Sequence, residues 1–503
     1  MSEKQGNLIR GHRLVRNVLW NLLGTGAPLL VAILAIPLLI EGLGVPRFGV
    51  LTLAWMVVGY FGLFDLGLGR ALTKLVAEKL GAGQDEEIPA LVWTAMSLMV
   101  VLGLLGGLFV AALTPWLVAS VLEVPPELQS ETILSFYLLA TSIPIVIATT
   151  GLRGVLEPRQ LFGLVNVIRI PLGLITFLGP VAVLPFSHSL VPVVAVLVVA
   201  RLAASVAYGV LCLQVEPALR HTFGVHRAII KSLISFGGWM TVTNIVSPLM
   251  VYLDRFLIGA MVSMAAVAYY ATPFEVVTKL LIIPGALMGV MFPAFSAAFV
   301  KDRPRAGRLF KRANNYIFIA LFPVILMIVT LAPEGLAIWL GSEFAGNSTV
   351  VLQLLAVGVF MNSHAQVPFG MVQGAGRPDL TAKLHLIELV FYLPILWMLV
   401  DAYGIVGAAI AWVARMAVDT LFLFVLAGKL LSEASRFTLR AALMIAVAFL
   451  ALGLGAMISG LAVKGTFLLI ILFLFAITAW FAILKTDERE MIRSRLSAIP
   501  LFN

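Results

Sequence analysis

The sequence predicts an all-α integral membrane protein with about 14 transmembrane helices. Of its 503 residues, 61% are hydrophobic and 12% are charged, whereas soluble proteins are roughly half apolar and about a quarter charged. Apolar runs of about 20 residues, the length that crosses a bilayer, recur from Val18 to Leu484. Because these runs are continuous rather than alternating, they predict helices that satisfy their own backbone hydrogen bonds, not barrel strands.

The predicted spans follow these apolar runs in chain order. The polar interruptions between them are shorter than about 20 residues, which is too short for a soluble catalytic domain. We therefore expect a protein that works within the membrane and is not an enzyme. The predicted spans are 15–40, 47–72, 88–113, 131–153, 160–186, 190–213, 235–260, 266–297, 313–340, 350–373, 380–400, 404–428, 438–460 and 465–485.

Basic residues lie in alternate loops, as the positive-inside rule predicts. The segments assigned to the cytoplasm contain 26 of the 34 lysines and arginines, and the opposite loops contain only Arg47 and Lys464. This placement predicts that both termini are cytoplasmic, and it argues against nucleic acid as the partner of a chain with net charge +9. The basic run from Lys301 to Arg312 is expected to meet anionic membrane lipids. With Cys212 as the only cysteine, neither an intramolecular disulfide nor a cysteine-based zinc site can form.

Two sequence matches at nearly the same offset indicate an internal duplication. Gly154 and Pro158, where the fourth span ends, correspond to Gly374 and Pro378, where the tenth span ends, 220 residues later. Residues 48–51 match residues 267–270 at an offset of 219. We therefore predict two pseudo-symmetric six-helix lobes plus two extra C-terminal helices. The predicted domains are residues 1–214, residues 215–429, and residues 430–503 with the last two spans and a cytoplasmic tail.

Several motifs in the first three hundred residues resemble those of Wzx-type bacterial polysaccharide flippases. The resemblance covers Phe48–Ala54, Leu63–Leu72, Leu253–Gly259 and Ala268–Tyr270. It implies a carrier of the superfamily that also contains multidrug-extrusion proteins and lipid II flippases. Such a carrier has two lobes around a central cationic cavity. It moves an undecaprenyl-pyrophosphate-linked oligosaccharide to the periplasmic leaflet of the bacterial inner membrane, with no cofactor and with polysaccharide-assembly proteins as further partners.

Six cations fall within predicted spans, where each costs about 2.5–3.5 kcal/mol unless it is paired, hydrated or bound to a ligand. Lys279 lies four residues after Glu275, and Arg415 lies four residues before Asp419, so each pair shares a helical face. Asp65 and Arg70, five residues apart, are less well placed for pairing. The six cations are Arg70, Arg169, Arg201, Arg255, Lys279 and Arg415.

Arg169 and Arg201 have no acidic residue within four positions. One interpretation is structural: Glu388 lies about 220 positions beyond Arg169 in the related helix, so the two could bond between the lobes. The other is a ligand site, because an arginine fork matches phosphate oxygens bidentately. In this second interpretation Arg169 and Arg201, assisted by Arg415 and Lys279, hold the pyrophosphate of the lipid-linked sugar.

The remaining charges within the spans are candidates for gating the lobes or coupling transport to an ion. His364 and His385 are interpreted as hydrogen-bonded core residues that could take part in proton coupling. Their separation and the lack of other nearby ligands give no metal motif. No metal site is therefore expected. The gating and ion-coupling candidates are Asp65, Arg70, Asp254, Arg255, Glu275, Glu388 and Asp419.

Two other functions stay open at the level of sequence. An ion-coupled multidrug or small-molecule antiporter of the same superfamily would share the fold, but a cationic cavity would repel a cationic drug. A membrane polysaccharide polymerase or ligase would generally present a long periplasmic loop with an acid or base constellation, and every predicted outer loop here is short.

Overall fold

Every regular element that the structure describes is a helix. The computed structural model describes residues 28–60, 67–221, 223–233, 250–431 and 439–490, apart from positions 29, 160, 228, 232, 251, 485 and 487. Within these ranges, nine helices are long and apolar enough to cross a membrane, and shorter apolar helices occupy residues 30–43, 45–57 and 444–457. The prediction of an all-helical, multi-pass membrane protein is confirmed.

The chain divides into two compact units after Ala271, and each is described by itself. The lobe boundary predicted near residue 214 stays a prediction. The first unit contains a helix over residues 30–43, α2 (Val45–Tyr60), α3 (Leu68–Gly81), α4 (Ile88–Trp116), α5 (Pro126–Leu156), α6 (Phe162–Val183) and α7 (Leu190–Val215). Residues 252–261 are also helical, and α9 (Met264–Thr278) crosses the boundary between the units.

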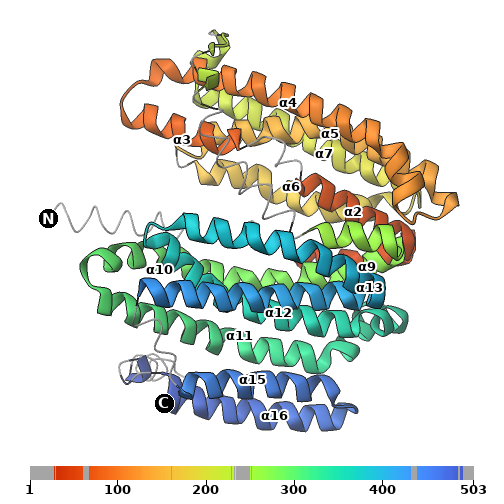
Figure 1. Cartoon of the computed structure of the whole chain (residues 1–503). Helices are drawn as coiled ribbons and strands as arrows, with labels where there is room; N and C mark the ends of the chain where they lie inside the picture. Colours follow the sequence, from red (N-terminus) through yellow and green to blue (C-terminus); the bar gives the residue numbers. More distant parts are fainter. Residues whose placement is uncertain are drawn as a thin grey trace, which may run out of the picture. The chain divides into compact units, whose positions relative to one another are not determined.

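In the first unit, α5 packs between α4 and α7, and α6 lies against α7 (Figure 1). Residues at the first turns determine where these helices begin. Pro126 occupies the first turn of α5, where its missing N–H costs nothing. Ser189 caps α7 by accepting a hydrogen bond from the Val191 N–H. A Cβ at Gly103 of α4 would lie 2.6 Å from Cα of Pro144 in α5, so the absence of a side chain lets these two helices approach closely.

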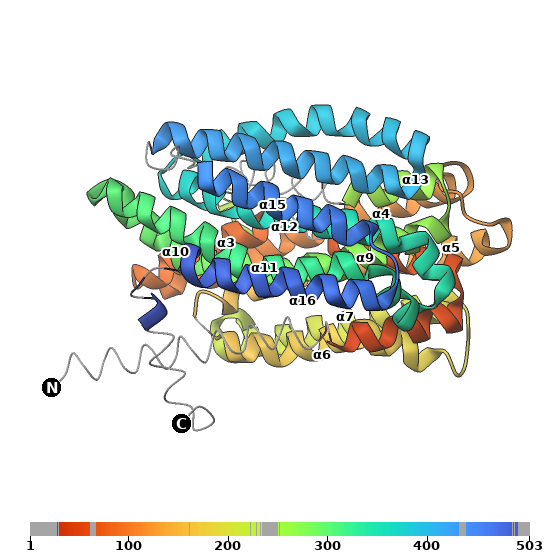
Figure 2. The same ribbon diagram turned by 90° about the horizontal axis from the view of Figure 1, so that it is seen from below.

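The second unit is a bundle of long helices around α12. Helix α12 packs against α10, α11 and α13, and the last two helices, α15 and α16, lie along α11 (Figures 1 and 2). Asp302 caps α11 by accepting a hydrogen bond from the Arg305 N–H. The bounds are α10 (Ile282–Lys301), α11 (Arg303–Leu340), α12 (Ser342–Gly374), α13 (Pro378–Leu430), α15 (Leu439–Met457) and α16 (Leu461–Thr478).

Helix α13 is two membrane spans joined at Gly404, whose φ of 55° and ψ of −133° are not helical. A residue with a side chain rarely adopts this positive φ, so glycine is the residue suited to the reversal. The reversal matters for the site because it brings the two halves of α13 back against each other.

Large apolar side chains cover the outward faces of the helices. Examples include Leu108 on α4, Phe391 on α13 and Leu469 on α16, which are 68%, 64% and 75% exposed. A soluble monomer rarely leaves so much continuous apolar surface exposed to water. Faces of this kind are suited to contact with lipid tails.

Candidate functional site

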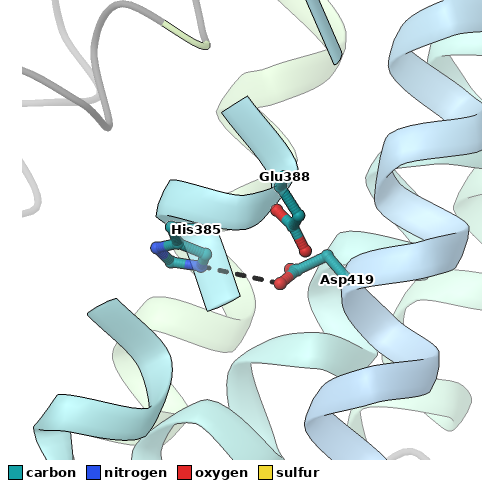
Figure 3. A group of neighbouring side chains, drawn as sticks. All are labelled: His385, Glu388 and Asp419. Atoms are coloured by element: carbon teal, nitrogen blue, oxygen red, sulfur yellow. Dashed lines mark ion pairs between the residues drawn. The ribbon is translucent and has the colours of Figure 1, made fainter. Parts of the chain in front are cut away.

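The two halves of α13 bring four ionisable side chains together in the second unit. Nε2 of His385 lies 3.5 Å from Oδ1 of Asp419, and Nε of Arg415 lies 3.7 Å from Oε2 of Glu388. His385 and Asp419 are 34 positions apart, which in a straight helix would separate them by about 51 Å. The reversal at Gly404 therefore builds the cluster, and Figure 3 shows three of its side chains turned toward one another.

The partner of Arg415 differs from the one that the sequence predicted. The structure pairs Arg415 with Glu388, and the predicted i,i+4 partner Asp419 is paired with His385. The guanidinium of Arg415 also lies 5.4 Å from the ring centre of Tyr392, within the range of a cation–π contact. Within the second unit, Glu388 pairs with Arg415. The bond predicted between Glu388 and Arg169 of the first unit stays a prediction.

The histidine predictions divide into one that agrees with the structure and one that does not. His364 is a hydrogen-bonded core residue: Nδ1 lies 3.3 Å from Oδ1 of Asn314, and the ring stands edge-on to Phe360. For His385 the expectation of no nearby ligands is wrong, because one donor atom each from His385, Glu388 and Asp419 lie within 4.8 Å of one another. The i,i+3 spacing of His385 and Glu388 was the available sequence signal, but Asp419 comes from the second half of α13.

The predicted ion pair between Lys279 and Glu275 is confirmed. Nζ of Lys279 lies 3.1 Å from Oε2 of Glu275, and the two side chains are 45% and 44% exposed. A pair this exposed is worth less than about 1 kcal/mol to stability. The lysine is thus not enclosed by other helices of its unit.

Arg169 and Arg201 lie in the first unit, on α6 and α7. Neither makes an ion pair with any side chain in the described ranges. Arg201 is half-buried and its Nη1 donates a hydrogen bond to the Leu197 carbonyl 3.1 Å away, whereas Arg169 is exposed. Because Arg415 and Lys279 belong to the other unit, a cavity shared by all four cations stays a prediction.

The two motifs predicted around the seventh span meet in space. Tyr270 donates a hydrogen bond of 2.6 Å to Oδ2 of Asp254, and both side chains are buried. Oδ1 of Asp254 accepts a hydrogen bond from the Arg255 N–H, and the buried guanidinium of Arg255 lies 5.2 Å from the ring centre of Tyr252. These contacts stabilise the end of this helix. Among the other gating candidates, Arg70 is exposed on α3 and Asp65 lies outside the described residues.

The structure also places Lys464 within a helix, although the sequence predicted a loop. Its Nζ lies 2.9 Å and 2.8 Å from the two carboxylate oxygens of Glu334 on α11, and its side chain is only 4% exposed. The apolar residues around Lys464 continue into α16, so the helix begins earlier than the predicted span. This buried ion pair ties α16 to α11.

Comparison with known proteins places the chain in a family. Residues 14–299 match the model of a family described as polysaccharide biosynthesis protein. This chain belongs to that family. A Shigella flexneri protein named "Putative O-antigen transporter" is 35% identical over 413 residues, which are 82% of this chain and 96% of that protein. The family match confirms the resemblance predicted from the motifs in residues 48–72 and 253–270.

Solved structures with low sequence identity share the fold. An inward-facing multidrug resistance MATE family transporter of the MOP superfamily aligns with a TM-score of 0.69 at 14% identity, covering 84% of this chain and 96% of that one. The lipid II flippase MurJ in an inward closed conformation aligns with a TM-score of 0.67 at 11% identity, covering 91% and 98%. At such identities the likeness shows the fold alone, and it confirms the predicted fold class.

The family match separates the candidate residues into two sets. Arg169, Arg201, Asp254 and Lys279 lie within residues 14–299 of this member of the polysaccharide biosynthesis family. The cluster on α13 lies beyond that match. The family match therefore says nothing of the cluster on α13, whose chemistry follows from its own geometry.

Proposed function

We propose that this protein is a flippase of cell-surface polysaccharide biosynthesis. It moves an undecaprenyl-pyrophosphate-linked oligosaccharide from the cytoplasmic to the periplasmic leaflet of the bacterial inner membrane. The observation that carries the proposal is the 35% identity, over 82% of this chain, to the O-antigen transporter relative. The transporter assignment agrees with the sequence prediction that the chain is not an enzyme.

The chemistry of the substrate explains the cations. A pyrophosphate head must cross about 30 Å of hydrocarbon while its lipid tail stays in the bilayer. Guanidinium groups that are not neutralised by protein carboxylates can replace its lost hydration with bidentate hydrogen bonds. Arg201, half-buried and without an ion pair to the described residues, is suited to this role. Arg169 assists it, and Arg415 and Lys279 do so when the substrate displaces their partners Glu388 and Glu275.

Transport by alternating access would then use rocking of the two predicted lobes, residues 1–214 and 215–429, around the cationic cavity. The gating and ion-coupling groups in this proposal are Asp254, Arg255, Glu275, Glu388 and Asp419, with Asp65 and Arg70 at the second span. Both termini would lie in the cytoplasm. Membrane lipids and polysaccharide-assembly proteins are the expected partners.

The test of the function is to deplete the protein and identify the lipid-linked intermediates that accumulate. We expect undecaprenyl-pyrophosphate oligosaccharides to build up on the cytoplasmic side, as measured by mass spectrometry of extracted lipids. Restored expression should clear them. Accumulation of unpolymerised oligosaccharide on the periplasmic side would instead indicate a polymerase or ligase, and unchanged lipids with altered drug resistance would indicate an antiporter.

A further inference from the structure

His385, Glu388 and Asp419 present one nitrogen and two carboxylates to a single point inside the second unit. One donor atom from each lies within 4.8 Å of the others, and Figure 3 shows the imidazole and both carboxylates directed toward the same space. The side chains of Glu388 and Asp419 are 4% and 7% exposed, and that of His385 is 21% exposed. The histidine is thus the least enclosed of the three side chains.

The nitrogens of Arg415 and His385 lie 3.7 Å and 3.5 Å from the two carboxylates, too far or too poorly aligned for hydrogen bonds. Both oxygens of Glu388 and Oδ1 of Asp419 are buried and accept no hydrogen bond from the residues that the structure describes. Buried polar atoms in native proteins nearly always have a partner, and an exception calls for an ion, a water or a proton. Two adjacent carboxylates also repel each other strongly in a low-dielectric setting. A cation held between them would remove both costs.

The donor set indicates which cation fits. Hard ions such as Mg²⁺ and Ca²⁺ prefer oxygen ligands, whereas imidazole together with carboxylates suits Zn²⁺ and neighbouring first-row metals. His385 and Glu388 are three positions apart on one helix, so they face the same side. The related Glu-x-x-His spacing supplies metal ligands in carboxylate helix bundles. We propose that His385, Glu388 and Asp419 bind a divalent transition-metal ion of the Zn²⁺ class.

Neighbouring side chains hold the ligands in place. The ring of Phe369 stacks on His385 with centroids 5.9 Å apart and planes 10° apart, which orients the imidazole. Arg415 approaches Oε2 of Glu388 at 3.7 Å and helps to orient this carboxylate, as outer-shell groups do in metal sites. With Zn–ligand bonds of about 2.1 Å, the donor atoms need to close to about 3.4 Å from one another. Separations of up to 4.8 Å would therefore shorten by up to about 1.4 Å. The site does not depend on the proposed flipping activity.

The test uses the purified full-length protein in detergent, with Zn²⁺ as the probe. The wild type should bind Zn²⁺ in isothermal titration calorimetry, and Zn²⁺ should raise its thermal unfolding midpoint because it binds the folded state. His385→Ala, Glu388→Gln and Asp419→Asn should each weaken this binding at least about tenfold. His364→Ala is the matched control, because His364 is the other core histidine on these helices and contacts Asn314 and Phe360, not carboxylates.

The outcomes separate the metal site from the alternatives. Mg²⁺ should give no comparable shift, and each variant should remain monodisperse by size-exclusion chromatography. Equal loss of Zn²⁺ binding in His364→Ala would overturn the proposal. The proposal would also be overturned if Zn²⁺ left the unfolding midpoint of the wild type unchanged while Asp419→Asn raised it. That result would indicate that the two carboxylates share a proton. If the wild type flips its substrate normally but does not bind Zn²⁺, the metal-site proposal fails and the proposed function stands.

Discussion

At the level of single residues, the charges within the helices fall into two groups. Arg415 and Lys464 lie beside carboxylates of neighbouring helical segments, and their side chains are less than a tenth exposed. Arg201 instead donates to a carbonyl of its own helix. A paired cation is explained by its acid, but a half-buried arginine without an ion pair to the described residues is suited to binding an anion that arrives from outside.

Substitution of Arg201 tests this role. Arg201→Ala removes a charge-assisted hydrogen bond worth about 2 kcal/mol, so flipping at low substrate concentration should fall roughly 30-fold. Arg201→Lys keeps the charge but loses the bidentate fork and should show a partial defect, and Arg201→Glu should abolish flipping. Flipping of a fluorescent lipid-linked oligosaccharide in proteoliposomes measures the effect, normalised to the amount of membrane protein.

Arg220→Ala is the control for loss of one exposed cation near the membrane, and its flipping should match the wild type. Normal flipping by both Arg169→Ala and Arg201→Ala would contradict the proposed pyrophosphate site. A structural role predicts another pattern, in which the arginine variants lose folded protein from the membrane before they lose transport.

Arg415 should matter for stability as well as for binding. Arg415→Met leaves Glu388 and Asp419 buried without their neighbouring guanidinium, and removal of one member of a buried pair costs about 3–5 kcal/mol. Adding Glu388→Gln should restore much of the lost stability. Thermal unfolding in detergent measures both effects. Lys279→Met is the comparison, because breaking its half-exposed pair with Glu275 should cost less than about 1 kcal/mol of stability. Equal losses of stability in Arg415→Met and Lys279→Met would show that burial does not cause the difference.

At the level of helices, close packing and buried pairs fix the second unit. A Cβ at Gly358 of α12 would lie 2.2 Å from the indole of Trp412 on α13, and Trp412 also packs edge-on against Phe274 of α9. Phe475 of α16 lies 5.0 Å, between ring centroids, from Phe322 of α11. The C-terminal helices are therefore attached to α11 through apolar contacts as well as the Lys464–Glu334 pair.

Gly358→Ala should destabilise the contact between α12 and α13. The added methyl group overlaps the buried indole of Trp412, and overpacking of this kind typically costs about 1–3 kcal/mol. Gly346→Ala, on the same helix, is the control because nothing lies within 4 Å of its Cβ position. That variant should be neutral or slightly stabilising, since alanine favours a helix. The two variants are compared by their thermal unfolding midpoints. Similar midpoints would show that α12 moves away from Trp412 without loss of stability.

The ion pair between α11 and α16 should respond unequally to loss of each partner. Glu334→Gln leaves the buried Lys464 ammonium without its counter-charge, whereas Lys464→Met leaves Glu334, which is 32% exposed, able to reach solvent. We expect the first change to cost about 3 kcal/mol and the second clearly less. Limited proteolysis and thermal unfolding detect loosening of the C-terminal helices. A larger loss in Lys464→Met would contradict the assignment of the lysine as the buried partner.

At the level of the whole molecule, the chain shares its fold with a MATE family transporter and with the lipid II flippase MurJ. The likeness to MATE and MurJ extends over most of the chain, and the polar segments between helices are short. If transport is driven by an ion gradient, the acidic residues within the helices are the groups that would bind the coupling ion. A membrane potential alone supplies about 2.3 kcal/mol per charge per 100 mV.

We expect flipping in proteoliposomes to accelerate when an ion gradient or a potential is imposed. Asp254→Asn, Glu275→Gln, Glu388→Gln and Asp419→Asn, tested one at a time, should identify the acid whose loss removes this acceleration while basal flipping remains. Asp379→Asn is the control, because Asp379 pairs at the exposed start of α13 with Arg377. Flipping that is indifferent to every gradient and to each acid would contradict ion coupling.

The fold class could be predicted from the sequence alone. Long apolar runs leave a helix as the form in which a lipid-exposed backbone satisfies its hydrogen bonds, and helical spacing sufficed to predict the Glu275–Lys279 pair. The ion-pair partners that come from different helical segments became visible only in the packed structure. Arg415 meets Glu388, Asp419 meets His385, and Lys464 meets Glu334. Spacing within one helix cannot reveal such contacts, because they depend on the reversal at Gly404 and on which helix faces pack together.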